Sequence, residues 1–171
     1  KKLQTYDIDY YNNLKPCPSC LIYHLGIKGK INELEFHNLF FTLNDTEMET
    51  YFTNFDITTR NIPFYLNITS KELETINLNY LEDKYETLFI LVPVNDKKYT
   101  NNQIDICLKN ISEKILEKTS FNIEENILVK KIIYNSDFKL NYNSFKSNAY
   151  GISCENYQFG FLRPSLKSLK I

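Results

Sequence analysis

The alternation of apolar and polar residues predicts five strands along the chain. Between residues 19 and 28, apolar side chains alternate with small or polar ones, and the stretch closes on Gly26 and Gly29, so we expect a strand followed by a turn. Four further stretches have strand character: residues 36–43, 62–69, 88–94 and 126–134. The run at 88–94 is bounded by Pro93 and predicts a buried strand. We expect the first two strands to pair as a hairpin through the connection at 28–35.

Helical periodicity is clearest between residues 100 and 118. Apolar side chains recur there every three or four residues, while charged side chains occupy other positions. The apolar positions are Ile104, Leu108, Ile111 and Ile115. A shorter helix is predicted at 46–54, with Asp45 as its N-cap and two glutamates in its first turn. Residues 6–15 indicate a helical turn or loop, and residues 70–86 are charged and irregular.

This order of elements predicts an α+β fold, in which helices cover one side of a mixed, mainly antiparallel sheet. The 171 residues suit a single domain spanning 1–171. A net charge of −1 with both signs mixed argues against a nucleic-acid-binding protein, which would show a basic stripe. The longest apolar run is too short to cross a bilayer, which leaves a position on a membrane surface open. Because the chain opens on Lys1, we expect a piece of a longer product.

Cysteine and histidine raise the question of metal or redox chemistry. Cys17 and Cys20 lie in a Cys-Pro-Ser-Cys sequence, with His24 and His37 downstream. This spacing fits zinc poorly, because no second cysteine pair follows and His24 would share a strand with Cys20. A thioredoxin-type pair needs a helix N-terminus, whereas a strand is predicted to follow Cys20. We therefore expect reduced, metal-free thiols that belong to the core.

We interpret residues 143–169 as a turn-rich crossing segment. Small residues from Ser147 to Gly151 would let the backbone approach a neighbour closely. Gly151 is one of only four glycines, so we expect it at a position where a side chain would not fit. Arg163 before Pro164 predicts an extended exit from the segment. On these residues alone, an ordinary surface loop is an equally good interpretation.

A set of motifs in fixed order runs along the chain. The crossing segment contains Asn148-Ala149-Tyr150-Gly151, then Gln158, then Arg163-Pro164-Ser165-Leu166-Lys167-Ser168. Upstream lies Pro18-Ser19-Cys20-Leu21-Ile22, followed by Leu25-Gly26. In order and spacing these motifs resemble the carotenoid desaturase family, the flavin-dependent enzymes that include phytoene desaturase. Residues 37–41, 88–94 and 137–145 also fall in the family's order, so the resemblance covers nearly the whole chain.

The resemblance implies the substrate-binding region of an amine-oxidase-like fold that binds FAD, without its Rossmann part. Four glycines cannot form the Gly-x-Gly-x-x-Gly turn that receives the pyrophosphate, so we expect this chain not to bind FAD tightly by itself and assign it no cofactor-binding residue. The implied activity is FAD-dependent introduction of double bonds into a carotenoid precursor, once the flavin-binding segments complete the enzyme. The alternatives are a sibling carotenoid isomerase, an oxidase or a retinol-saturase-like enzyme, or a non-catalytic remnant or lipid-binding module.

The resemblance also implies a site and partners. Tyr150, Gly151, Gln158, Phe161 and Arg163 are expected to bind substrate, and no catalytic residue is assigned. The expected partners are an isoprenoid or carotenoid substrate, the complementary flavin-binding part of the same enzyme and a membrane surface, so we expect a cytoplasmic protein that associates peripherally with membrane. The chain departs from the family pattern in one long stretch, because residues 71–85 lack its prolines and glycine. Whether the polypeptide is active is therefore open.

Overall fold

A computed structural model describes residues 5–41, 44–75, 84–165 and 167–168. The strands are β1 (Ser19–Lys28), β2 (His37–Phe40), β3 (Phe64–Ile68), β4 (Tyr85–Val94) and β5 (Ile127–Ile133). The α-helices are α1 (Ile8–Asn13), α2 (Asp45–Asn54), α3 (Thr69–Thr75), α4 (Asn101–Thr119), α5 (Ile123–Asn126) and α6 (Asn135–Tyr142). Three short 3₁₀ turns follow, η1 (Phe145–Ser147), η2 (Asn156–Gln158) and η3 (Gly160–Leu162). The elements thus confirm the predicted α+β class.

The five strands form one antiparallel sheet in the order β2-β3-β4-β1-β5. The predicted hairpin between the first two strands is wrong, because β1 pairs with β4 and β5, whereas β2 pairs with β3. β1 is ten residues long and buried along most of its length, so it takes a position with a neighbour on each side. The four-residue β2 is partly exposed and lies at an edge. Apolar alternation identifies strands but does not choose their partners.

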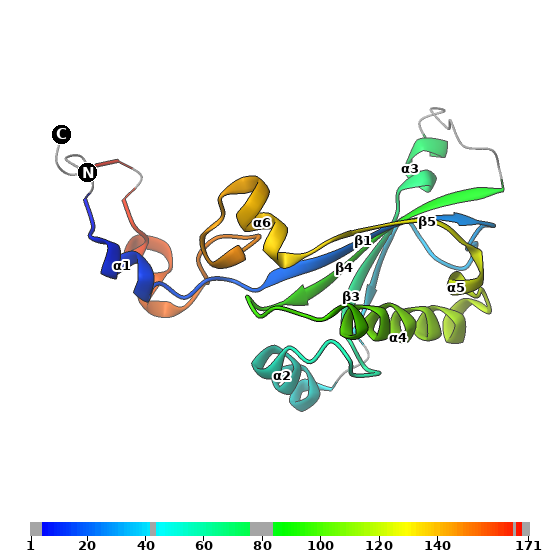
Figure 1. Ribbon diagram of the computed structural model, residues 1–171, viewed down its shortest axis with the longest axis horizontal. Helices are drawn as coiled ribbons and strands as arrows, with labels where there is room; N and C mark the ends of the chain where they lie inside the picture. Colours follow the sequence, from blue (N-terminus) through cyan, green and yellow to red (C-terminus); the bar gives the residue numbers. More distant parts are fainter. Residues whose placement is uncertain (1–4, 42–43, 76–83, 166, 169–171) are drawn as a thin grey trace.

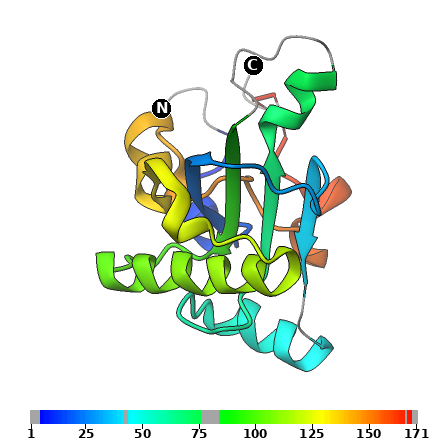
Figure 2. The same cartoon turned by 90° about the vertical axis from the view of Figure 1, so that its right-hand side faces the viewer.

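One face of the sheet packs against α4. The four apolar positions predicted from its periodicity are buried, together with Cys107, and Ile104, Ile111 and Ile115 are at most 1% exposed. Burying each of these side chains contributes roughly 1.5–3 kcal/mol. Tyr23 of β1 adds a specific contact, because its hydroxyl donates to the backbone oxygen of Ile104 at 2.8 Å. Figures 1 and 2 show α4 and α2 on the same side of the sheet, whereas α6 lies on the other side, so the helices do not cover one side alone.

Two local predictions at element ends are corrected. The N-cap of α2 is Asn44, whose side chain accepts from the Glu47 N–H in a capping box, and Asp45 is the first helical residue. Pro93 lies inside β4 and does not bound it. The proline is tolerated there because the pairing of β4 with β3 runs only from Leu88 to Leu91, so no β3 partner is lost at Pro93. Of the predicted irregular stretch at 70–86, residues 70–75 lie in α3 and 85–86 in β4, while 76–83 lie outside the described residues.

The first and last described segments of the chain lie side by side, away from the sheet. Figure 1 shows α1 beside η2 and η3, joined to the sheet by the backbone that leads into β1. An isolated antiparallel bridge between Pro16 and Ile152 ties the two segments together. In the same figure α6 lies on the opposite side of the sheet from α4, at the end where β1 begins. Among the described residues, no helix has the length and apolar character needed to span a membrane.

Candidate functional site

The sheet face opposite α4 presents two cross-strand rows of side chains, which we call the open face. Residues paired directly across neighbouring antiparallel strands share a face. The register therefore builds one row from Leu39, Tyr65, Leu91, Ile22 and Ile133. The adjacent row consists of His37, Asn67, Phe89, His24 and Lys131. Each row crosses all five strands, so the open face is a continuous surface that is apolar along one row and polar at the ends of the other.

Aromatic rings connect the two rows. Phe89 lies 5.3 Å from His24 and 6.2 Å from Tyr65 between ring centroids, both in edge-on geometry. The ring of His37 lies 5.9 Å from that of Tyr65. Aromatic pairs at these centroid separations prefer offset or edge-on geometry. Tyr65 and Phe89 are half-buried and Leu39 is 66% exposed, so the described part of the chain leaves much of this apolar surface uncovered.

His24 lies in the second row between Phe89 and Lys131. Burial against its neighbours lowers its pKa, and the positive charge of Lys131 on β5 lowers it further. A neutral imidazole suits a face whose other central residues are apolar. The open face therefore carries little charge at its centre at neutral pH.

Tyr150 closes the open face near the start of β1. Its hydroxyl interacts with the thiol of Cys20, a buried residue of β1 that pairs with Pro93. Burial raises the pKa of Cys20 to about 11 and that of Tyr150 to about 12, so both groups stay protonated near neutrality. Because Tyr150 remains 60% exposed, its ring is accessible at the border of the face. Of the five predicted site residues, Tyr150 is the one that this contact places at the sheet.

Asn148 holds the backbone that carries Tyr150. Its side-chain oxygen accepts from the Tyr150 N–H at 2.8 Å and also from the Gly151 N–H. Its amide nitrogen donates to the backbone oxygen of Cys17 at 2.5 Å. Ser19 supports the same junction, because its hydroxyl donates to the backbone oxygen of Ser147 at 2.6 Å. The start of β1 and the crossing segment are thus joined by side chains as well as by backbone.

Gly151 is explained by its backbone conformation, and Gln158 by its buried hydrogen bonds. Gly151 has a φ of +90°, and a Cβ there would have no described atom within 4 Å, so the expected close approach is wrong and the backbone conformation explains the glycine. A groove of about 280 Å³ beside it is lined mainly by apolar residues, including Leu14, Pro16 and Ile152. Gln158 is 1% exposed and fully engaged in hydrogen bonds, so its side chain holds the fold together.

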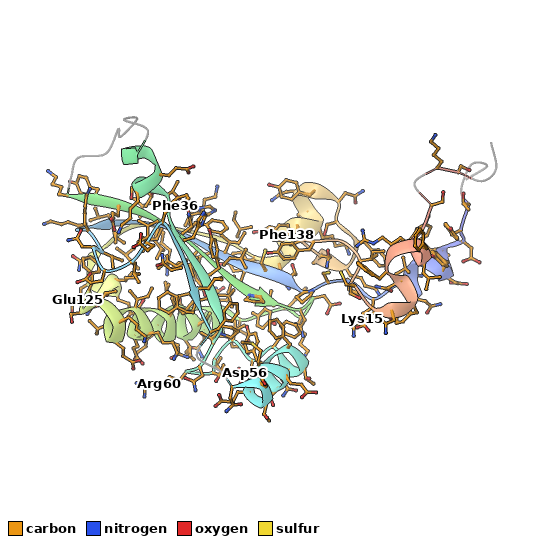
Figure 3. The ribbon with its side chains drawn as sticks, turned by 180° about the vertical axis from the view of Figure 1, so that it is seen from behind. Lys15, Phe36, Asp56, Arg60, Glu125 and Phe138 are labelled. Atoms are coloured by element: carbon orange, nitrogen blue, oxygen red, sulfur yellow. The ribbon has the colours of Figure 1, made fainter. Side chains whose placement is uncertain are left out.

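Phe161 and Arg163 lie with η3, at the end of the molecule that carries α1 (Figure 1). Phe161 is fully exposed, and the guanidinium of Arg163 lies 5.9 Å from the centre of the Phe159 ring. Figure 3 shows Lys15 beside η2 at this end, with Phe138 of α6 nearer the sheet. The structure therefore brings Tyr150 and Gly151 together but leaves Phe161 and Arg163 apart from the open face.

The described residues do not gather into a metal centre or a dinucleotide site. No group of three or more His, Cys, Asp or Glu side chains in the described ranges could hold a metal ion. Cys20 and Cys107 are buried free thiols, and the Cys17 thiol donates to the backbone oxygen of Ile152 at 3.4 Å. All strand pairings here are antiparallel, whereas an FAD pyrophosphate is received by a parallel strand–helix–strand unit. This part of the chain thus does not fit the dinucleotide end of FAD.

Comparison with known proteins identifies relatives along most of the chain. The carotenoid 3,4-desaturase of Haloarcula japonica is 26% identical over 170 residues, which are 95% of this chain and 32% of that protein. The 1-hydroxycarotenoid 3,4-desaturase of a Flavobacterium species is 29% identical over 146 residues, which are 85% of this chain and 29% of that protein. The chain resembles carotenoid desaturases. No family model matches it. The chain spans about a third of the length of these desaturases.

The resemblance to desaturases was predicted from the crossing segment, but the open face was not. Its residues are spread over five strands and meet only through the register. One signal was present in the sequence. The run 88–94 of β4 is apolar at positions that point to both faces, including Phe89 and Leu91, whereas a strand with one solvated face would alternate. Continuous apolar character therefore indicated that the second face of β4 also carries apolar side chains.

Proposed function

We propose that this chain is the substrate-side portion of a carotenoid desaturase-like oxidoreductase, and that its open face binds the polyene. The observation that carries the proposal is an apolar row that crosses the sheet and is only partly covered, in a chain similar to desaturases over 95% of its length. A polyene offers only apolar surface and π-electrons. Leu39, Tyr65 and Leu91 provide matching contacts, and Phe89 provides an aromatic edge.

In this proposal the chain's own residues bind the substrate, orient it and exclude water from it. FAD, when bound by the complementary part of the enzyme, supplies the oxidising power that removes hydride from the isoprenoid chain. The open face contributes a rigid floor, because its strands are fixed by the α4 core beneath them. Exclusion of water follows from the same apolar row. The chemistry requires no charged side chain at the centre of the face.

Tyr150 forms the border of the proposed channel, and the crossing segment positions it. The proposed role of Gly151 is to give the turn after Tyr150 its positive φ, and that of Gln158 is to fix the segment onto Lys15. Phe161 and Arg163 are exposed at the α1 end, where we assign them to contact with the complementary flavin-binding part. Because the substrate dissolves in lipid, the completed enzyme would work at a membrane surface in the cytoplasm.

Two alternatives use the same surface. A sibling isomerase, oxidase or retinol-saturase-like enzyme would bind a similar polyene and differ in the later chemical steps. A non-catalytic lipid-binding module would bind apolar chains without turnover. The open face suits each of them, so binding tests the surface, and reconstitution with a flavin-binding partner tests the reaction.

The proposal can be tested by titrating the purified chain with phytoene in detergent micelles. After gel filtration, the absorbance of the polyene that elutes with the chain measures how much is bound. Leu91→Asn places an amide in the centre of the apolar row, and we expect it to weaken binding about tenfold. Leu140→Asn is the matched control, because Leu140 is 79% exposed on α6 and belongs to neither row. We expect the control to bind like the unaltered chain. No binding by the unaltered chain, or equal binding by Leu91→Asn, would contradict the proposal.

A further inference from the structure

The strand β2 has one edge that is unpaired among the described residues. It is the last strand on its side of the sheet and pairs with β3 alone. Just before it, the Phe36 oxygen accepts from the Ile68 N–H at 3.0 Å. Because backbone groups along an antiparallel strand point alternately toward and away from the partner strand, Asn38 also bonds toward β3. The N–H and C=O groups of His37 and Leu39 therefore point toward the free edge.

This edge lacks the features that usually prevent a strand from pairing with another chain. Leu39 is 66% exposed, and Phe41, the residue after β2, is 55% exposed. Residues 37–41 contain no lysine and no proline, and the β2–β3 register contains no bulge. Natural proteins commonly protect edge strands with one of these features. An exposed apolar edge without them can accept a further strand.

Space for a further strand lies beside this edge. A groove of about 510 Å³ is lined by residues 37–41 together with Glu33, Leu34 and Lys118. Phe40 packs into the core on the α4 side and Leu39 belongs to the open face, so the groove reaches both faces of the strand. Its lining carries one acidic residue and one lysine, so the groove does not select a strongly charged partner.

We propose that β2 pairs with β2 of a second copy of this chain, antiparallel and with Leu39 on the two-fold axis. In this register Leu39 lies opposite its own copy and His37 lies opposite Phe41, so no like charges face each other. The other edge of the sheet suits self-pairing poorly, because two β5 strands would bring together the exposed Lys130 and Lys131 of both copies. The charges at the two edges therefore favour β2 as the interface.

The second copy would lengthen the open face. Neighbouring strands lie about 4.8 Å apart, so the row from Leu39 to Ile133 spans roughly 19 Å over the five strands. Pairing Leu39 with its own copy continues this row directly into the same row of the second chain. An extended C40 polyene is longer than a single row and shorter than the doubled one. This consequence rests on the proposed function, whereas the pairing of β2 does not.

Sedimentation velocity of the purified 171-residue chain, measured without polyene, tests the pairing. Over a concentration series we expect a reversible dimer, since the four-residue β2 offers few hydrogen bonds. Leu39→Lys places two positive charges opposite each other on the axis and should weaken the dimer about tenfold. Leu39→Glu should do the same with negative charges. An equimolar mixture of the two variants should restore the dimer, because opposite charges then meet.

A matched control addresses the other edge of the sheet. Leu128 is 58% exposed on β5, so Leu128→Lys should leave the dimer as stable as that of the unaltered chain. Circular dichroism checks that each variant keeps the fold. A chain that stays monomeric at every concentration, a dimer that Leu39→Lys leaves intact, or a mixture that fails to dimerise would overturn the proposal. None of these results bears on polyene binding, which the phytoene titration tests separately.

Discussion

The side chain of Gln158 pairs with the backbone of Lys15 as a neighbouring strand would. Its Oε1 accepts from the Lys15 N–H at 3.0 Å, and its Nε2 donates to the Lys15 oxygen at 2.6 Å. The same nitrogen donates to the Ser153 hydroxyl at 2.8 Å. Two segments 143 residues apart in sequence are thereby joined by one buried amide. The position of the crossing segment, and with it the border of the open face, depends on this pairing.

Gln158→Leu should destabilise the chain although it keeps most of the side-chain volume. The Lys15 N–H would lose its partner in a partly buried place, which costs about 1 kcal/mol of the free energy of unfolding. Urea denaturation followed by circular dichroism measures the change. Tyr157→Leu is the control at the neighbouring position, because Tyr157 is 60% exposed, and its effect should stay within about 0.5 kcal/mol. Equal effects of the two substitutions would show that the pairing is unimportant.

Gly151→Ala should destabilise through backbone strain alone. A φ of +90° is unfavourable for a residue with a side chain, and the cost is about 1–3 kcal/mol in the free energy of unfolding. Gly26→Ala is the matched control, since a Cβ there meets Val129 at an ordinary 3.6 Å and no positive φ is involved. Alanine at that position should be neutral or slightly stabilising. Thermal unfolding of both variants measures the two changes in stability. If Gly151→Ala leaves stability unchanged, backbone strain at this position is not the reason for the glycine.

Much of the fold could be predicted from the sequence, because its elements are specified locally. The helix α4 follows from the spacing of Ile104, Leu108 and Ile111, and the strand β1 from its alternation. Strand partners are a different matter, since the choice between β2 and β4 as neighbour of β1 depends on the whole sheet. The cap of α2 moved by one residue because Asn44 and Asp45 are both good capping residues and only geometry distinguishes them.

Alkaline pH should destabilise the chain through its buried thiols. Burial raises the pKa of Cys107 from 9.0 to about 12, so the folded chain keeps a proton that the unfolded chain releases first. The resulting stability is fully present below pH 9.0 and is lost as pH rises toward about 12. Urea midpoints measured from pH 8 upward should therefore fall, and Cys107→Ala should fall less steeply. Cys154→Ala, at an exposed position, is the control and should follow the unaltered chain.

The candidate site could be predicted only in part. The motif around Tyr150 was visible in the sequence, and its contact with Cys20 links that motif to the sheet. The pairing of Gln158 with Lys15 could not be foreseen, because nothing in a linear pattern brings positions so distant together. The same holds for Tyr65 and His37, which belong to different strands and approach through the β2–β3 register. Sites built across a sheet are set by pairing, and pairing is a property of the folded chain.

Whether the open face binds the polyene is tested most directly by photo-crosslinking with a diazirine-bearing C20 isoprenoid. Mass spectrometry then identifies the residues that carry adducts. We expect adducts concentrated on Leu39, Tyr65, Phe89 and Leu91, and competition by unlabelled phytoene should remove them. Exposed apolar residues elsewhere provide the internal comparison, notably Leu140 and Phe161. Adducts that lie mainly on those two residues, or that persist under competition, would contradict a polyene-binding role for the open face.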